Sequence, residues 1–521
     1  MIKRMFKYLV VVVVGFGIGF VSYTAYPYIS REAPALYKTV RSWKIFQGNL
    51  PKFEKVAAGT FFSLALADDG NLWVAGANRE GQLGVGIRDD VKGWVNCFSG
   101  VKDISVGNTH SMVLTNDGRL WVAGSNHYGE LGLGYKVKGA LNWRNVLSNV
   151  VAIAAGQRHS LAVTKDGRLW VAGDNNKEQL GLRRYIEKVY YVRAPDGTKK
   201  KKIKKIWQTK IRRWRSVLNN VKAVYAGVNH SLVLKKDDSL WVAGSNSYGQ
   251  YGLGEIMGGS KWVKVMDNVK KLSKGFSDSS IVIRKTTKEL EEDAVAREKY
   301  RDYLRKRAKE EAKIKAEILR GDLEEDETTV NIRAPIYIPQ GGGELLVTGW
   351  NWNGQIGVLA PEEEVEEDAG EFSDFEEERE RNHQYYWAEV LTDVMGVSSA
   401  PNNCFAITND GTLWASGSNS RGQLGCGGEN NSWEWVQVFS NVRDVSAGYF
   451  HSLLVTKDGE LWVAGDNFHG QLGTKRRFDE EIWIKIKKFE KKRPAKFRYL
   501  ENMYDENDMP GDVKEEEELG G

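Results

Sequence analysis

Four of the seven histidines in this chain of 521 residues occupy one position of a repeated phrase, and imidazoles that recur in this way could bind a metal ion. Each is followed by a serine, and the four are His110, His159, His230 and His451. In the other units the position is taken by Phe62, Asp278 and Asn403. A repeating fold would distribute these residues around a ring, so a ring metal site competes with a second interpretation, hydrogen-bonded histidines in the core, which is the commoner role.

No other catalytic arrangement stands out. The sequence has no spacing typical of a Ser-His-Asp triad, a zinc-binding HExxH motif, a phosphate-binding loop or paired carboxylates. Cys97, Cys404 and Cys426 lack CxxC spacing and are predicted to be small buried side chains. The sequence therefore predicts a protein that is not an enzyme and that uses no cofactor.

A second chemical feature is the basic segment at residues 183–215, which contains 14 Lys or Arg residues and two acidic residues. Phosphate groups of lipid or nucleic acid could bind such a strip, and a solvated loop is an equally good interpretation. As a partner we expect anionic lipid rather than nucleic acid. The candidate anion-binding residues are Lys199, Lys200, Lys201, Lys202, Lys204, Lys205, Arg212 and Arg213.

A repeat defines the elements that must position these residues. The phrase LWVAGSNHYGELGLG from Leu120 has counterparts that begin at Leu72, Leu169, Leu240, Leu345, Leu413 and Leu461, which makes seven units. Where no insertion intervenes, the repeated Trp recurs after 48 or 49 residues. A period of this length is typical of propeller blades or solenoid turns.

Within a unit, the alternation of residue types predicts β-strands. Residues 110–115 and 119–124 read as two strands joined by a glycine hairpin, a Trp-containing strand such as the one from Trp143 follows, and a fourth strand begins near Val101 in its unit. Four short strands in each of seven units predict an all-β fold, a seven-bladed β-propeller at residues 43–489. Eight Trp strands are available for seven units, so either end of the chain could complete the last blade.

The pattern GxxHS…TxDGxLWxxGxNxxGQLG resembles the repeat of the regulator of chromosome condensation family, and the resemblance implies a seven-bladed β-propeller. Family members include an exchange factor for the small GTPase Ran that acts by protein contact, a plant UV-B photoreceptor and a secreted inhibitor of β-lactamase. The photoreceptor senses light through Gly-Trp-Arg-His-Thr motifs, and the phrases GNTHS, GQRHS, GVNHS and GYFHS lack that tryptophan. The resemblance therefore implies protein binding. Together with the N-terminal segment described below, it indicates a membrane-anchored member of bacterial type.

Three insertions interrupt the repeat. Besides the basic insertion at 183–215, residues 287–331 are rich in helix formers and predict a long helix or a helical hairpin. This helical insertion is either a partner-binding arm or a solvated decoration. Residues 361–382 contain 12 acidic residues and two arginines and are predicted to be disordered, as is the acidic end of the charged tail at 490–521.

The N-terminal residues 1–30 predict a membrane anchor or signal segment, followed by a linker at 31–42. Residues 8–30 carry no charge, and the apolar stretch at 8–28 is long enough to cross a bilayer as a transmembrane helix. The preceding basic residues Lys3, Arg4 and Lys7 favour a cytoplasmic N-terminus, which places the propeller of this single-pass protein on the extracytoplasmic side. Secretion after signal cleavage is the alternative.

These features predict a non-enzymatic scaffold or inhibitor, displayed at a membrane, that binds another protein through its propeller faces and insertions. The alternative is a regulatory or guanine-nucleotide-exchange-like factor for a small GTPase, which the reverse membrane orientation would permit.

Overall fold

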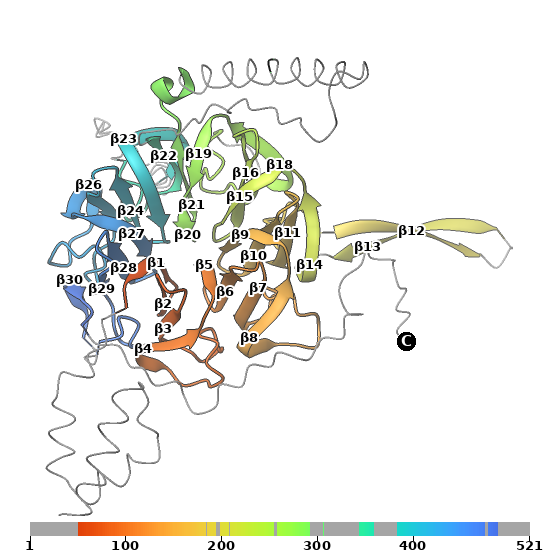
Figure 1. Ribbon diagram of the computed structural model, residues 1–521. Helices are drawn as coiled ribbons and strands as arrows, with labels where there is room; N and C mark the ends of the chain where they lie inside the picture. Colours follow the sequence, from red (N-terminus) through yellow and green to blue (C-terminus); the bar gives the residue numbers. More distant parts are fainter. Residues whose placement is uncertain are drawn as a thin grey trace, which may run out of the picture. The chain divides into compact units, whose positions relative to one another are not determined.

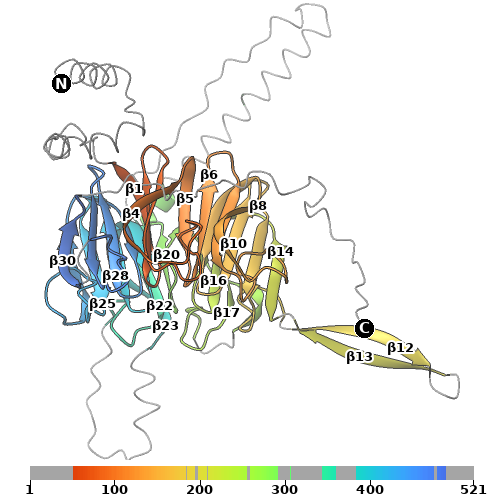
Figure 2. The same ribbon diagram turned by 90° about the horizontal axis from the view of Figure 1, so that it is seen from below.

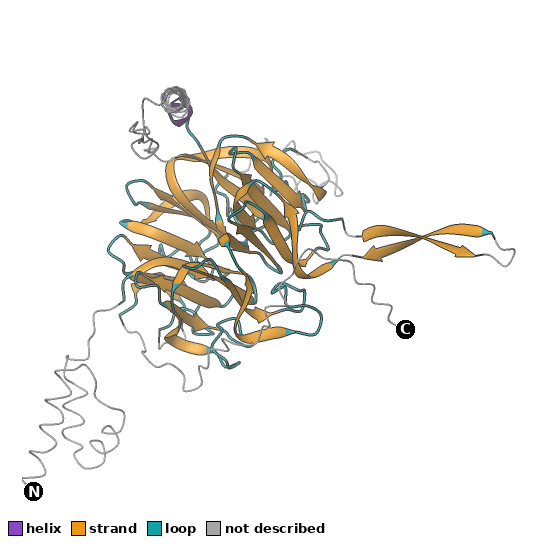
Figure 3. Cartoon of the chain, turned by 45° about the vertical axis from the view of Figure 1, so that its right-hand side comes forward, coloured by secondary structure: helices purple, strands orange, loops and turns teal. Residues whose placement is uncertain are grey.

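The computed structural model describes residues 51–183, 185–193, 198–207, 209–254, 258–291, 306, 343–358, 383–474 and 478–487. All of them belong to the second of two compact units of the chain, Met1–Leu50 and Pro51–Gly521. They form an all-β fold of seven four-stranded antiparallel blades around a common centre (Figures 1 and 3). The predicted all-β class and the four-stranded units are confirmed.

The first strand of each blade lies nearest the centre and the fourth lies on the rim (Figure 1). Blades 1 to 3 contain β1 (Phe53–Ala58), β2 (Phe62–Ala67), β3 (Leu72–Gly76) and β4 (Val91–Phe98); β5 (Val101–Val106), β6 (His110–Thr115), β7 (Leu120–Ser125) and β8 (Gly139–Leu147); and β9 (Val150–Ala155), β10 (His159–Thr164), β11 (Leu169–Asp174) and β14 (Lys210–Leu218). Blades 4 and 7 contain β15 (Val221–Ala226), β16 (His230–Lys235), β17 (Leu240–Gly244) and β18 (Gly259–Met266); and β27 (Val442–Ala447), β28 (His451–Thr456), β29 (Leu461–Gly465) and β30 (Glu480–Lys485).

Blades 5 and 6 share one long strand. Blade 5 contains β19 (Val269–Leu272), β21 (Ser279–Arg284), β22 (Gly343–Trp350) and the first part of β23 (His383–Ser399). The short β20 (Lys274–Gly275) pairs with Ser398 and Ser399 at the end of β23. Blade 6 contains the last part of β23 with β24 (Asn403–Thr408), β25 (Leu413–Gly417) and β26 (Ser432–Phe439). The strand passes from one blade to the next at Val394, which pairs with both β22 and β24.

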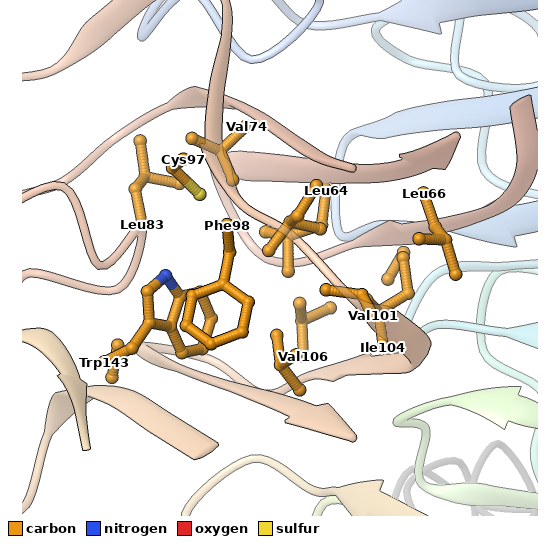
Figure 4. Close-up of a cluster of buried hydrophobic side chains, with 14 of the residues drawn as sticks. Leu64, Leu66, Val74, Leu83, Cys97, Phe98, Val101, Ile104, Val106 and Trp143 are labelled. Carbon is orange, nitrogen blue, oxygen red and sulfur yellow. The ribbon is translucent and has the colours of Figure 1, made fainter. Parts of the chain in front are cut away.

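The hydrophobic core is divided among the interfaces between blades. In the cluster between blades 1 and 2, Leu64 and Val74 of blade 1 pack with Val106 and Trp143 of blade 2 (Figure 4). The described residues form seven such clusters, one for each pair of neighbouring blades. Because burial of one Leu or Val side chain contributes roughly 1.5–3 kcal/mol, each blade depends for its stability on both neighbours.

In each blade, a tryptophan on the fourth strand packs against a glycine of the preceding blade. Trp94 of blade 1 donates from Nε1 to the carbonyl oxygen of Leu472 in blade 7 at 3.1 Å, and its ring covers Gly473. The equivalent pairs in the other blades are Trp143 with Gly84, Trp214 with Gly132, Trp262 with Gly181, Trp387 with Gly252, Trp435 with Gly357 and Trp483 with Gly425. The last glycine of each repeated GQLG phrase therefore packs against the ring of a tryptophan from the next blade.

The ring closes between blades 1 and 7 without an exchange of strands between them. The four strands of blade 1 and the four strands of blade 7 each follow one another along the chain, and the C-terminal Trp strand is β30. Contacts across this seam include the amide of Ala58, which donates to Ser446 Oγ at 2.8 Å, and the amide of Phe53, which donates to the carbonyl oxygen of Gly459 at 2.9 Å. The competing Trp strand at residues 43–49 lies outside the described residues.

In the described part of the chain, we find no helix with the length and apolar character needed to cross a bilayer. The predicted anchor or signal segment at 1–30, the linker at 31–42, the acidic insertion at 361–382 and the charged tail at 490–521 lie outside the described residues.

A capping box starts a helix at the beginning of the helical insertion. The helix starts at residue 287, and its first turn is described through residue 291. The Thr286 amide donates to Glu289 Oε2 at 3.1 Å, and the Glu289 amide donates to Thr286 Oγ1 at 3.2 Å. The buried carboxylate of Glu289 also pairs with Lys270 of blade 5, so this turn is held against the ring.

Replacement of Glu289 by Ala should lower the free energy of unfolding by about 1–2 kcal/mol and accelerate amide hydrogen exchange at 287–291, because the cap and the ion pair are lost together. The matched control is Lys288→Ala, which changes an exposed side chain of the same turn. Equal stabilities of the two variants in urea unfolding would show that the capping box does not hold the turn.

Candidate protein-binding face

The repeated histidines connect neighbouring blades. His110 Nε2 of blade 2 lies 2.9 Å from Ser160 Oγ of blade 3, and His451 Nε2 of blade 7 lies 2.9 Å from Ser63 Oγ of blade 1. His159 and His230 form the same contact with Ser231 and Ser280, at 2.9 and 3.0 Å. All four histidines are fully buried. The prediction of hydrogen-bonded core histidines is confirmed.

The serine hydroxyls determine the tautomer of these imidazoles. Ser160 Oγ donates its proton to the carbonyl oxygen of Glu130 at 2.7 Å, so it can only accept from His110, which must carry its proton on Nε2. Nδ1 of each of the four histidines has no hydrogen-bond partner within the described part of the chain. Burial accordingly lowers the pKa of His110 and His230 to about 3.

The position equivalent to these histidines in blade 5 is Ser279, and the sequence-based assignment of Asp278 was wrong. Ser279 pairs with Gly349 in the way that His110 pairs with Gly124. The loop from Gly275 to Ser279 contains one residue more than the loop from Gly107 to His110. A one-residue insertion in a loop moves no strand, so it escapes an alignment based on motif spacing alone.

The described residues contain no group of three or more His, Cys, Asp or Glu side chains that could hold a metal ion. Cys97 and Cys404 are buried as predicted, and burial raises the pKa of the Cys97 thiol to about 12. Cys426 is exposed, contrary to the prediction, because it lies in the loop between β25 and β26.

In the NxxGQLG loops at one end of the blades, the Asn and Gln side chains make recurring hydrogen bonds, and the two residues after the Asn differ between blades. In blade 7, Asn467 Oδ1 accepts from the Leu472 amide at 3.0 Å and Gln471 Oε1 accepts from the His469 amide at 2.9 Å. The same Asn contact recurs in every blade. These buried amide side chains fold the NxxGQLG loop and leave its two variable residues at the tip.

In blades 7 and 1 the two variable residues of the NxxGQLG loop of blade 7 meet residues of the loops between the first and second strands in an aromatic cluster, which we call the aromatic sector. It consists of Phe61, Tyr449, Phe450, Phe468 and His469. The Phe61 ring centroid lies 5.0 Å from that of His469 and 6.1 Å from that of Phe450, and the Phe468 ring meets His469 edge-on at 5.1 Å. Phe468 is 66% exposed. The sector was not predicted from the sequence, although the phrases GYFH and NFHG that form it are present there.

On blades 2 and 3, Arg158 of the loop before β10 and Lys210 and Arg212 of the rim strand β14 supply cations at this end of the blades. Arg158 Cζ and Lys210 Nζ lie 4.5 and 4.7 Å from the centroid of the Tyr128 ring. Arg212 Nη2 donates to the carbonyl oxygen of His127 at 3.3 Å. An aromatic residue between cations can contact both apolar and acidic groups of a partner.

The predicted basic strip is divided between two elements. Lys199, Lys200, Lys201, Lys202, Lys204 and Lys205 lie on β13 (Lys199–Trp207), which pairs with β12 (Tyr185–Arg193) in a separate two-stranded hairpin (Figure 2). Arg212 and Arg213 lie on β14, the rim strand of blade 3, where Arg213 is exposed and Arg212 is half-buried. The insertion thus contributes a β-hairpin in addition to the rim strand.

Comparison with known proteins agrees with this architecture. The Regulator of chromosome condensation (RCC1) repeat matches residues 53–82, 101–130, 150–179, 221–250 and 442–471, and a second description of the same repeat matches 117–163 and 410–455. No curated protein sequence matches the chain.

Among solved structures, human WBSCR16 is 16% identical, with a TM-score of 0.55 over 80% of this chain and 94% of its own. Yeast RCC1 (Prp20) bound to Kap60 is 15% identical, with a TM-score of 0.54 over 83% of this chain and 85% of its own. Prp20p from Saccharomyces cerevisiae, described together with its binding to Gsp1p and histones, is 14% identical, with a TM-score of 0.55 over 82% of this chain and 88% of its own. At these identities the similarity concerns the fold.

Proposed function

Because the chain belongs to the regulator of chromosome condensation repeat family, we propose that it is a non-enzymatic scaffold or inhibitor that binds another protein through the loop face described above. The observation that carries this proposal is the aromatic sector, five aromatic side chains on neighbouring loops of blades 7 and 1. The loop of Phe468 and His469 is folded by buried Asn and Gln side chains without a partner, so its binding loses little conformational entropy.

The composition of the face suits a protein partner. Aromatic residues and arginine supply most of the binding energy in protein interfaces, and here Phe468 and Phe61 lie on the same end of the blades as Arg158. A small GTPase is one partner that this proposal admits, since Prp20p is described with binding to Gsp1p. In that case the chain would be a regulatory or exchange-like factor.

The place of action that we propose is a membrane. The uncharged residues 8–30, with the basic residues before them, support a single-pass anchor with the propeller on the extracytoplasmic side. A partner that resides in the cytoplasm would contradict this orientation and favour the small-GTPase alternative.

A photo-crosslinking amino acid at position 468 should capture the partner protein in cells, because that side chain is 66% exposed at the tip of its loop. Once the partner is known, Phe468→Ala should weaken its binding tenfold or more, as expected for an aromatic anchor. Isothermal titration with the purified full chain measures this loss.

The matched control is Tyr386, which is 65% exposed on β23 at the rim of blade 5. A crosslinker at position 386 should not capture the same protein, and Tyr386→Ala should bind it normally. Equal capture from both positions, or full affinity of Phe468→Ala, would exclude the aromatic sector as the binding site.

A further inference from the structure

The β12–β13 hairpin exposes large hydrophobic side chains to water. Its strands pair over nine residues each, from Tyr185 opposite Trp207 to Arg193 opposite Lys199, and they form a sheet with no third strand. Among its described side chains, the exposed large hydrophobic ones are Val189, Tyr191, Ile203, Ile206 and Trp207. A two-stranded hairpin is only marginally stable in water, so a surface that covers these side chains would stabilise it.

The register places most of these side chains on one face. Residues directly opposite each other in an antiparallel pair lie on the same face, and alternate residues share it. Val189 lies opposite Ile203, and Tyr191 and Trp207 fall on the same face as this pair. Lys201 and Lys205 are interspersed with them, and Lys205 Nζ lies 4.4 Å from the centroid of the Tyr185 ring. The exposed Glu187, opposite Lys205, lies on this face as well. We call this mainly apolar and basic surface the hairpin face.

We propose that the hairpin face binds the surface of a bilayer that contains anionic lipids. The insertion at 183–215 has 14 basic and two acidic residues, which makes it complementary in charge to such a surface. Tyr and Trp side chains favour the interface between lipid and water, and lysine stems can lie along apolar surface while the ammonium group reaches a phosphate.

The aliphatic pair favours a bilayer over nucleic acid. Val189 and Ile203 are 45% and 55% exposed, and they lie between the lysines of the hairpin. A nucleic acid offers phosphates to the lysines and bases to the aromatic rings, but it has no apolar region for adjacent aliphatic side chains. The interfacial region of a bilayer accommodates all three kinds of side chain, and its water can satisfy the free backbone edges of the hairpin.

The test uses the full chain with Cys426→Ser and a spin label at Ile203→Cys, since the remaining cysteines, Cys97 and Cys404, are buried. The chain is mixed with vesicles of phosphatidylcholine alone or of phosphatidylcholine with phosphatidylserine. In the anionic vesicles, the label should become accessible to oxygen and protected from a water-soluble paramagnetic reagent. A label at Val151, which is 43% exposed on β9, should remain accessible to the water-soluble reagent in both kinds of vesicle.

A charge-reversal variant identifies the groups responsible. Reversal of Lys201 and Lys205, which lie on the hairpin face, to Glu should lower the hairpin's affinity for anionic vesicles by roughly tenfold. The control reverses the same number of exposed lysines elsewhere, namely Lys92 and Lys102. Any membrane binding by residues 8–28 is common to both variants. Equal melting temperatures would show that both remain folded.

Two results would overturn the proposal. One is a label at position 203 that remains exposed to water in both kinds of vesicle. The other is a lysine-dependent shift of the label by a single-stranded oligonucleotide without any shift by vesicles, which would assign the hairpin to nucleic acid. Phe468→Ala should leave the label signal unchanged, so failure of the protein-binding face and failure of the lipid-binding hairpin can be distinguished.

Discussion

Acidification from about pH 7 to about pH 5 should destabilise the propeller by several kcal/mol, because four histidines are buried without charge between its blades. Burial lowers the pKa of His110, His159 and His230 to about 3 and that of His451 to about 4, from 6.5 in a solvated chain. Below pH 6.5 the unfolded chain therefore takes up protons that the folded chain excludes.

The free energy of unfolding should therefore decrease as the pH falls below 6.5. Each histidine stabilises the fold fully above pH 6.5, and its contribution falls as the pH decreases toward the folded pKa of about 3 to 4, by at most about 1.4 kcal/mol per pH unit. Asp278 acts in the opposite direction, because burial raises its pKa to about 6 and the folded chain keeps that proton where the unfolded chain has lost it. The net loss is therefore smaller than the sum over four histidines.

Blade 6 provides a non-titrating replacement for the buried histidines. In blade 6 the equivalent residue is Asn403, whose Nδ2 donates to Ser452 Oγ at 3.4 Å without a titrating group. A chain with all four histidines replaced by Asn should lose most of the pH dependence between about pH 6.5 and about pH 5. Urea unfolding, followed by tryptophan fluorescence at each pH, measures both chains. A wild-type midpoint that does not change over this interval would show that the histidines do not control acid stability.

Replacement of Gly473 by Ala should open the seam between blades 7 and 1 and lower the free energy of unfolding by roughly 2–5 kcal/mol, the sum of two costs. Gly473 has φ +65°, which an alanine adopts only with strain. An added Cβ atom would also lie 2.3 Å from the Trp94 ring, which is fully buried. Among the described residues no strand pairs across this seam, so the contact between Trp94 and Gly473 matters more there than at an interface where a strand is shared.

A Gly100→Ala variant separates the cost of backbone strain from the cost of the clash with Trp94. The φ of Gly100 is +72°, close to that of Gly473, but a Cβ atom there would have no atom within 4 Å. Gly100→Ala should therefore show only the backbone cost, about 1–2 kcal/mol. Amide hydrogen exchange of β1 and β27 should accelerate selectively in Gly473→Ala, since both strands face the seam. If the two variants are equally destabilised, the contact between Trp94 and Gly473 does not contribute to ring closure.

Much of the fold could be predicted because the strand signal is local. The alternation in residues 110–124 and the glycine turn between the two strands predict a hairpin without knowledge of the remaining chain, and β6 and β7 occur there. The basic insertion lacks such a signal, since a run of lysines has low strand propensity. Residues 199–207 become β13 because they pair with the β-branched and aromatic residues of β12.

The candidate site was less predictable, because its residues come together only in the ring. Phe61 and His469 are far apart in sequence, and each is an ordinary loop residue in its own unit. Their ring centroids lie 5.0 Å apart because blade 7 packs against blade 1. The sequence contained the aromatic phrases, but their joint position on one face depends on the closure of the propeller.

The amino-acid sequence alone established the number of units, the strands within them and the positions of the recurring histidines, tryptophans and glycines, since alternation and positive φ act over a few residues. Tertiary structure established what these residues contact. His451 binds Ser63, 388 positions away in sequence, and Trp94 covers Gly473. These contacts depend on closure of the ring, which brings the first and last blades together. The conformational preferences of individual residues act over a few positions, so they do not specify contacts between residues this far apart in sequence.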